Sequence, residues 1–297
     1  MTRDSDSITP DTIDRFETGA EAFAYLRLVG TKDDGEIDVG EVALALALVN
    51  LPGINVTRYR HHLAKLVEHA RDDYSSRKRT GEDTLAMQAD VLRHVIHEAH
   101  GYHGDTQTYD DLDNANLIRV IDRRKGLPVA LGIIYIVVGR ALGFAIDGLS
   151  FPGHFILRLE RDGQRLILDP FRDGAELDAA DLRQLVKKMI GEQAELSHKY
   201  YTAVGNRELL LRLQNNLKTR LIENEDYHQA LQVIETMAAI APDEVRTLFD
   251  KAVLYAKLGQ IRQAAAALEE YIARIPDARE KQQARQLLQQ ILQMQER

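Results

Sequence analysis

A run of residues without a polar face lies near the middle of the chain, from Leu127 to Gly139. A helix that is apolar on every side belongs in a protein interior, and these 13 residues are too few to span a bilayer. Pro128 suits the first turn of a helix, where its missing N–H costs nothing, and Gly143 suits the end. The pattern predicts a central helix buried on all sides, with close packing at Gly132.

Two alternating apolar runs follow this helix, at residues 155–160 and 165–171. They are separated by Asp162-Gly163, and this dipeptide between alternating runs is a strong hairpin signal. A two-residue turn makes the numbers of paired residues sum to 325 along the ladder. The sequence therefore predicts a small antiparallel sheet.

The predicted register brings two polar side chains together. Ile156 faces Asp169, and because side chains alternate along a strand, His154 shares the face of Ile156. An imidazole beside a carboxylate is the base and its orienting group in a nucleophilic triad. The alternative interpretation is a buried hydrogen-bonded pair with a structural role.

Helical patterns fill most of the remaining chain. The first 12 residues are polar, contain no apolar signal segment, and are expected to be disordered. Residues 14–79 favour helices, including a buried one at 41–49 that residues 50–53 end and an amphipathic one at 56–79. A further amphipathic helix is expected at 84–100.

A repeat is visible in the C-terminal third. Residues 216–242 align with residues 250–276 at an offset of 34, with small residues at Ala230 and Ala264 and a proline closing each copy. A period of 34 residues with this pattern resembles tetratricopeptide repeats. The segment around 192–201 and a final helix at 279–294 are expected to cap the repeats. Glu225 departs from the pattern, because Gly259 occupies its place in the second copy.

Composition narrows the class of protein. Hydrophobic residues make up 44% of the 297 positions and charged residues 28%, which is ordinary for a soluble globular chain of about two domains. The net charge of −8 argues against nucleic acid or an anionic membrane as a partner. The absence of cysteine excludes a disulfide-stabilised fold and thiolate chemistry. A cytoplasmic location is expected.

The central motifs together resemble a known family. They comprise residues 101–105, 109–116, 120–128, 151–155 and 169–171, and their order and content are similar to the core of the transglutaminase-like superfamily. Within it, the chain resembles bacterial transglutaminase-like proteins with C-terminal tetratricopeptide repeats, a family named after a regulator of invasion genes. The resemblance implies an α+β, mostly helical fold: a transglutaminase-like (papain-like) core with a small antiparallel sheet, then an all-α repeat domain. The expected divisions are 1–12, 13–191 and 192–297.

The resemblance also assigns site residues. His154 and Asp169 fall on the family's triad-like histidine and aspartate, and the family's cysteine falls on Pro128. Proline offers no nucleophile, and an orienting acid and base without one fail the requirements of acyl transfer. We therefore expect a non-catalytic protein with a regulatory or assembly role. The alternative is an amide hydrolase or acyltransferase that uses His154 and Asp169 with a water or substrate nucleophile.

Other polar residues are candidates for the same pocket. The resemblance places Asn114 and Asn116 in a loop that leads into the core, where either could hydrogen-bond the backbone near the pair; turn-making and helix capping are the commoner roles. Tyr135 lies two turns into the central helix, and Phe171 follows Asp169 closely. No cofactor is expected.

A row of histidines raises the question of a metal. His94, His97, His100 and His103 recur at every third position, which drifts around a 3.6-residue helix and does not converge. The acidic loop 102–116 lacks the spacing of a calcium-binding EF-hand. The sequence predicts surface or capping histidines and no metal, with a site at His94 and His97 as the minor alternative. The predicted partner is a protein or peptide bound by the repeats, and a homodimer stays open.

Overall fold

The computed structural model describes residues 16–295, with residues 52 and 82 left out. The predicted disorder of residues 1–12 lies outside the described residues. By compactness the described chain forms two units. The first contains residues 16–25 and 32–213, and the second contains residues 26–31 and 214–295. The division at Leu213 comes later than the boundary expected after residue 191.

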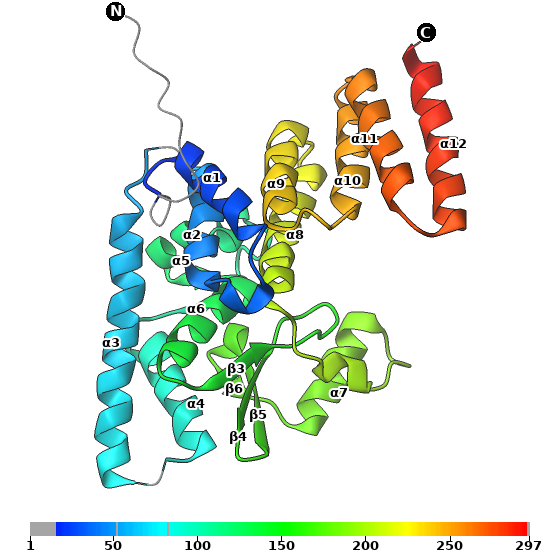
Figure 1. The fold of residues 1–297 in the computed structure, drawn as a ribbon. Helices are drawn as coiled ribbons and strands as arrows, with labels where there is room; N and C mark the ends of the chain where they lie inside the picture. The colour runs from blue at the N-terminus through cyan, green and yellow to red at the C-terminus, as the bar shows by residue number, and fades with distance from the viewer. Residues whose placement is uncertain (1–15, 52, 82, 296–297) are drawn as a thin grey trace, which may run out of the picture. The chain divides into compact units, whose positions relative to one another are not determined.

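The first unit is built around the predicted buried helix, α6 (Pro128–Ala141). Pro128 is its first residue, and nearly every side chain along it is buried. Around α6 pack four helices (Figure 1), namely α2 (Val39–Val49), α3 (Thr57–Thr80), α4 (Leu85–Arg93) and α5 (Leu117–Arg123). The predicted central position of α6 is confirmed.

Short elements connect these helices. They are α1 (Gly19–Val29), the 3-10 turn η2 (Asp34–Glu36), the π-helical turn η3 (His94–Ala99), the 3-10 turn η4 (Leu112–Ala115), and the parallel strands β1 (His103–Gly104) and β2 (Lys125–Gly126). The helix predicted at 84–100 is therefore α-helical only to Arg93 and widens to a π-helix beyond it.

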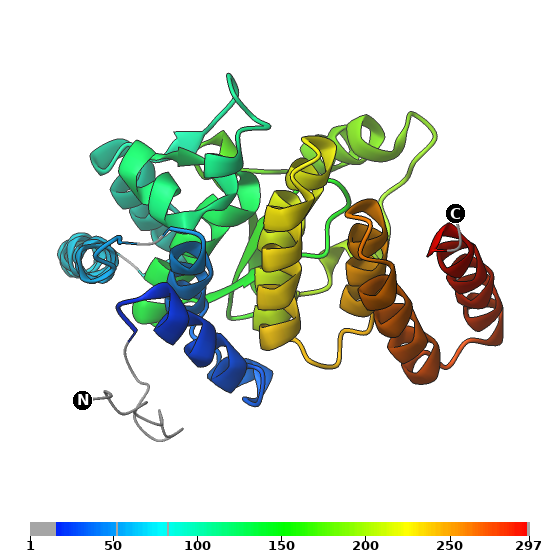
Figure 2. The same cartoon turned by 90° about the horizontal axis from the view of Figure 1, so that it is seen from above.

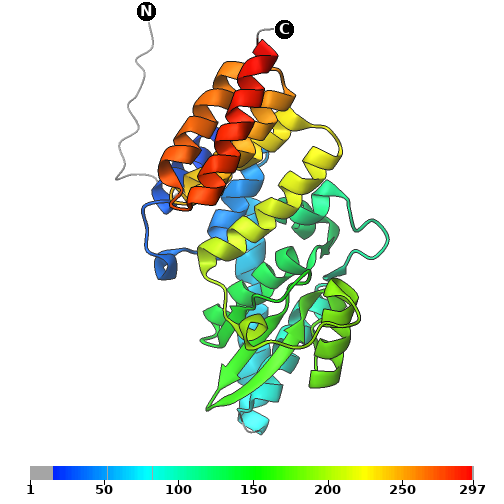
Figure 3. The same cartoon turned by 90° about the vertical axis from the view of Figure 1, so that its right-hand side faces the viewer.

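A four-stranded antiparallel sheet covers another side of α6, in the order β3-β4-β5-β6. Its strands are β3 (Ala145–Gly148), β4 (Leu157–Arg161), β5 (Gln164–Asp169) and β6 (Ala175–Glu176). The β4–β5 hairpin is the long strand pair in Figure 3. Its pairs run from Leu157 with Leu168 to Arg161 with Gln164, which is the predicted register. Asp162 (φ 50°) and Gly163 (φ 77°) form the two-residue turn.

The chain leaves the sheet through the 3-10 turn η5 (Pro170–Arg172), then forms α7 (Ala179–Ile190) and the 3-10 turn η6 (His198–Tyr201). Leu182 and Val186 of α7 join an apolar cluster with Phe151. Leu196 and Tyr200 pack against this same cluster, and Ser150 N–H donates to the carbonyl of Thr202 (2.9 Å). The segment 192–201 thus packs on the core of the first unit, and the expectation that it caps the repeats is wrong.

Helical hairpins make up the second unit. Its helices are the C-terminal part of α8 (Asn206–Glu223), α9 (Tyr227–Ile240), α10 (Arg246–Lys257), α11 (Ile261–Arg274) and α12 (Ala278–Gln295). The bounds of α9 and α11 differ by the predicted offset of 34 at both ends. The small residues Ala230 and Ala264 are fully buried. Helices α10, α11 and α12 follow one another side by side (Figure 2).

An N-terminal segment joins this second unit. Residues 26–31 belong to it by compactness, and a Cβ added to Gly30 would lie 2.2 Å from the carbonyl oxygen of Ala239 in α9. Gly30 therefore lets two backbones meet closely. No pattern in the sequence predicts this association.

Glu225 occupies a left-handed backbone position at the turn between α8 and α9, with φ 60°, and Gly259 has φ 71° at the equivalent place. A side chain in this conformation costs about 1–2 kcal/mol, partly offset by the greater chain entropy that glycine loses on folding. We expect Glu225→Gly to raise the free energy of unfolding by about 0.5–1 kcal/mol, measured by urea denaturation. The reverse change, Gly259→Glu, should lower it by about the same amount, and a gain in stability there would contradict the explanation.

Candidate functional site

His154 and Asp169 form a direct pair. The imidazole Nε2 lies 3.0 Å from each carboxylate oxygen of Asp169, and the Asp169 side chain is 1% exposed. Asp169 ends β5, where its Oδ1 also accepts the backbone N–H groups of Phe171 (2.9 Å) and Arg172 (3.3 Å). Three donors therefore satisfy one buried carboxylate, which fixes the ring of His154 by its Nε2 edge.

The structure corrects how the pair arises. Strand β4 begins at Leu157, so His154 lies on the preceding loop and not on the strand opposite Asp169. Gly153 has φ 67° and lies against Met189, where a side chain would collide. The loop returns to the sheet edge through a hydrogen bond from Leu149 N–H to the carbonyl of Ile156 (3.0 Å). The predicted contact is present, but a glycine-containing turn produces it.

Arg212 holds this loop from α8. Its guanidinium Nη2 donates to the carbonyl oxygens of Phe151 (2.9 Å) and His154, and its charge lies over the Phe155 ring, 5.4 Å from the centroid. Burial lowers the pKa of the Arg212 guanidinium. Arg212 could not be identified from the sequence, because it is 58 positions from His154 and its helix showed no chemical signal.

The pair belongs to the part of the fold that packs on α6. The ring of Phe155 fills the space beside Gly132, one turn into α6, where an added Cβ would lie 2.4 Å from a ring carbon. The 3-10 turn η5, directly after Asp169, also packs against α6. Pro128 is the buried first residue of that helix.

An aromatic series covers the histidine. The Phe171 ring meets the His154 ring edge to face at 6.2 Å between centroids, and the Tyr109 ring meets Phe171 at 5.6 Å in the same way. Gly104 permits this arrangement, since an added Cβ there would lie 2.4 Å from the Phe171 carbonyl oxygen. Tyr109 is 39% exposed and forms the outer surface of the series.

The loop that carries Tyr109 is anchored by Asp105, a buried carboxylate. Asp105 accepts from the Thr108 hydroxyl (2.6 Å) and pairs with Lys125 (2.9 Å) and Arg123 (3.1 Å). Burial acts to raise the pKa of Asp105, but the hydrogen bonds from Thr108 and Lys125 outweigh it and hold the pKa below its ordinary value. A fully bonded buried carboxylate of this kind is structural.

The remaining predicted pocket residues are Asn114, Asn116 and Tyr135. The Asn114 amide donates to the carbonyls of Thr108 and Tyr109. Asn116 caps α5 by accepting the Arg119 N–H (3.2 Å). Asn116 also donates from Nδ2 to the carbonyl oxygen of Ala47 in α2 (3.4 Å). Among the described residues, no hydrogen bond joins Asn114 or Asn116 to the backbone beside His154. The Tyr135 hydroxyl is buried without a hydrogen-bond partner in the described part of the chain, next to Gly174, and burial raises the pKa of Tyr135.

Three histidines of the predicted row, His94, His97 and His100, contact side chains that the sequence did not predict. His69 of α3 contacts His100 of the segment after η3 (Nδ1 to Nε2, 3.0 Å), and its ring also lies 6.4 Å from the ring of His94. His97 instead reaches Asp173 (3.3 Å). Among the described residues, no group of three or more histidine, cysteine or acidic side chains is arranged to hold a metal ion.

His62 is the most perturbed member of this histidine cluster. Its Nε2 lies 2.9 Å from the Tyr102 hydroxyl and 2.6 Å from Nη1 of Arg124. Burial, followed by the charge of Arg124 and the neighbouring His100, lowers the pKa of His62 to about 4. The histidine therefore stays neutral in the folded protein down to acidic pH.

A pH-dependent loss of stability follows from His62. Because its folded pKa is below the unfolded value of about 6.5, its stabilising contribution is complete above pH 6.5 and declines as the pH falls toward 4. After allowance for solvent screening of a half-buried group, we expect His62→Gln to abolish about 1 kcal/mol of the loss in unfolding free energy between pH 7 and pH 5. Urea denaturation at both pH values measures it. The exposed neighbour gives the control: His61 is the smallest of the causes that lower the pKa of His62, so His61→Gln should change the loss far less than His62→Gln.

A buried helix, a hairpin and a histidine–aspartate pair set beside that helix define a transglutaminase-like fold. A family model described as the transglutaminase-like superfamily matches residues 57–215, and the chain belongs to this superfamily. A second family model, tetratricopeptide repeat, matches residues 217–289. Both fold predictions are confirmed. Among the described helices, none combines the length and apolarity that crossing a membrane would need.

Bacterial relatives extend over most of the chain. A "UPF0162 protein" of Vibrio cholerae is 30% identical over 81% of this chain and 87% of its own length. A "UPF0162 protein" of Xylella fastidiosa is 28% identical over 84% of this chain and 88% of its own. "Protein SirB1" of Salmonella typhimurium is 27% identical over 72% of this chain and 78% of its own.

Proposed function

We propose that this chain is a non-catalytic member of the transglutaminase-like superfamily that binds a protein or peptide partner through its repeats. One observation carries the proposal: His154 and Asp169 are paired, while Pro128 begins α6 and the sequence contains no cysteine. An imidazole oriented by a carboxylate still lacks the atom that would attack an amide. The proposed setting is the bacterial cytoplasm, in a regulatory or assembly role.

A structural function of the pair supports the absence of catalysis. Asp169 receives bonds from the loop, through His154, and from η5, through Phe171 and Arg172. Because the carboxylate is buried, its bonds are energetically important, and removing a partner of a buried charge costs more than the pair contributes. The pair therefore fastens the loop before β4 to the end of β5, and this role needs no substrate.

The repeats support the proposal of a protein or peptide partner. Tetratricopeptide helices present a groove that can hold an extended peptide or a helix, and residues 217–289 match that family. The net charge of −8 disfavours nucleic acid and anionic membranes as partners. A homodimer formed through the same helices is the alternative occupant of the groove.

The test places a photo-crosslinking amino acid in the full chain at Lys257 in α10, or at the exposed Arg165 in β5. We expect crosslinking to a cellular protein from Lys257, unchanged when His154→Ala is added, and none to that protein from Arg165. Crosslinks that depend on His154 or arise only from Arg165 would contradict the proposal.

One feature favours a second function, catalysis without cysteine. All hydrogen bonds that the His154 ring makes to the described residues involve Nε2, so Nδ1 is the nitrogen able to accept a proton from a water or a substrate amine. An amide hydrolase or acyltransferase would release ammonia from a glutamine-containing peptide incubated with a primary amine. Turnover that disappears in His154→Ala would establish this function and exclude the first.

A further inference from the structure

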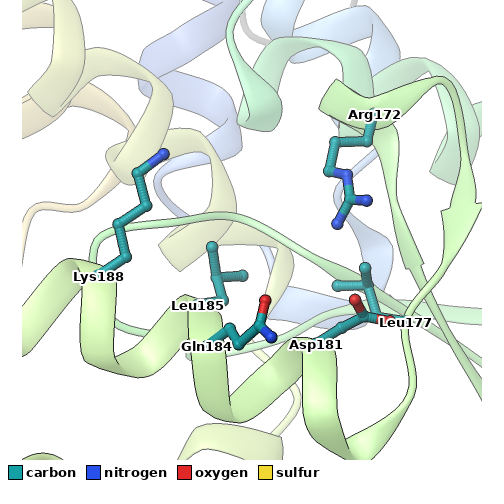
Figure 4. Close-up of a pocket in the computed structure, with 6 residues that line it drawn as sticks. All are labelled: Arg172, Leu177, Asp181, Gln184, Leu185 and Lys188. Carbon is teal, nitrogen blue, oxygen red and sulfur yellow. The ribbon is translucent and has the colours of Figure 1, made fainter. Parts of the chain in front are cut away.

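A cavity of about 180 Å³ opens between the turn after β5 and helix α7. It is lined by Arg172, Leu177, Asp181, Gln184, Leu185 and Lys188 (Figure 4). The four lining residues of α7 follow the i, i+3, i+4, i+7 spacing of a single helix face. Leu182 and Val186 are the buried core positions of α7, and the partly buried Leu185 packs against the same apolar cluster while it lines the cavity. The lining residues include neither His154 nor Asp169 and no residue of the repeats.

Two cations face this cavity. Figure 4 shows the Arg172 guanidinium extending toward α7, while Lys188 and Leu185 extend from α7 toward the opposite wall. Both basic side chains are exposed, and within the described residues neither joins an ion pair. In a chain of net charge −8, two positive side chains without an ion-pair partner among the described residues favour an anionic ligand.

The single acid of the cavity, Asp181, offsets only one of these two positive charges. Asp181 Oδ2 accepts the backbone N–H of Asp178 (3.1 Å) at the start of α7, where it completes a capping box. Its carboxylate is thus engaged with the helix N-terminus, at the opposite end of the lining face from Lys188. The net character of the cavity is cationic.

Apolar surface continues from the cavity along α7. Met189 is 37% exposed and Ile190 is 51% exposed, and they directly follow Lys188. Leu177 and Leu185 supply apolar wall inside the cavity. These exposed side chains offer apolar surface to a ligand that enters the cavity.

We propose that this cavity docks a peptide segment of a partner protein that carries a carboxylate beside an apolar side chain. The carboxylate lies between Arg172, which can bind it with two N–H donors, and Lys188. The apolar side chain packs on Leu185 and extends toward Met189. The volume accommodates one or two side chains, so the ligand is a short linear segment that binds by its sequence.

The site borders the pair through its backbone. Arg172 N–H donates to Asp169 (3.3 Å), and Met189 lies against Gly153, the residue before His154. A bound peptide would therefore rest against both segments that the pair joins. Since it uses neither the imidazole nor the repeats, its binding is independent of the function proposed above.

The test measures fluorescence anisotropy of a labelled peptide of alternating glutamate and leucine with the full chain. We expect saturable binding that weakens at least tenfold in the double variant Arg172→Glu, Lys188→Glu. The control is Lys187→Glu, which makes the charge reversal of Lys188→Glu one position away, outside the cavity, and should alter affinity less than twofold. Because these three side chains are not in the core, circular dichroism should show unchanged folding.

Two further peptides test which chemical features of the ligand the cavity recognises. A peptide of alternating lysine and leucine should bind at least tenfold more weakly, and one of glutamate and serine should also lose affinity. Equal binding of the lysine peptide, absence of saturable binding, or an unchanged affinity in the double variant would overturn the proposal. Binding of anionic lipid vesicles that competes with the peptide and is lost in the double variant would overturn the peptide as the ligand.

Discussion

Gly132→Val is expected to lower the free energy of unfolding by about 3 kcal/mol, although valine is the better helix former by a few tenths of a kcal/mol. The two effects have opposite signs, and packing dominates. A Cβ at residue 132 would lie 2.4 and 2.7 Å from two carbons of the Phe155 ring, and the ring is itself 2% exposed, with little room to move. Overpacking of a closed core commonly costs about 1–3 kcal/mol, and the branched side chain places it at the upper end.

Urea denaturation of the full chain measures this change. The control is Gly35→Ala in the 3-10 turn Asp34–Glu36, where nothing lies within 4 Å of an added Cβ, and stability should change by less than about 0.5 kcal/mol. A stabilised Gly132→Val would mean that helix propensity prevails and that Phe155 does not pack against α6. The loop carrying His154 would then lack its main support.

Patterns within a single segment predicted much of the fold. The apolar run after Pro128 predicted α6, because a helix with no polar face belongs in the protein interior. Asp162-Gly163 fixed the hairpin, since a two-residue turn leaves one register. The offset of 34 predicted the pairs α8–α9 and α10–α11. In each case the information is local or periodic.

The sequence could not predict the contacts between distant segments. His69 and His62 of α3 contact a histidine that follows α4. The spacing of residues along one helix does not indicate which second helix packs against it. The π-helical turn His94–Ala99 also changes the phase of the row. The hydrogen bond from Arg212 to the His154 carbonyl could not be predicted either, because the two residues are far apart in the sequence.

The segment 192–201 illustrates an ambiguity of apolar side chains. Leu196 and Tyr200 suit any apolar surface, so their sequence favoured neither the repeats nor the first unit. Hydrogen bonds decide the matter, because Thr202 accepts from Ser150 and Ala203 bridges Leu149. A backbone bridge of this kind depends on where the two strands lie, which composition does not specify.

Pro128→Cys is expected to create a reactive thiol with a pKa well below the ordinary value of about 8.5. The N-terminus of the 14-residue helix α6 would stabilise a thiolate at this position. If Pro128 occupies the superfamily's nucleophile position, an imidazolium at His154 would stabilise it further. Alkylation by iodoacetamide as a function of pH gives the pKa, which we expect at or below about 7.5. The chain has no other cysteine, so all incorporated label reports on residue 128.

The double variant Pro128→Cys, His154→Ala separates the two contributions. Loss of the imidazole should return the midpoint most of the way to about 8.5, because the helix N-terminus alone contributes about 0.3–1 kcal/mol, which is less than one pKa unit. Because residue 128 is buried, which raises a thiol pKa, the comparison of the two variants is decisive: the same midpoint in both would show that residue 128 lies out of reach of His154. The assignment of Pro128 to the nucleophile position would then fail, together with the interpretation of this chain as an enzyme fold that has lost its thiol. A low midpoint with hydrolysis of a glutamine amide would show the converse, that the rest of the site is preserved and one side chain separates the protein from catalysis.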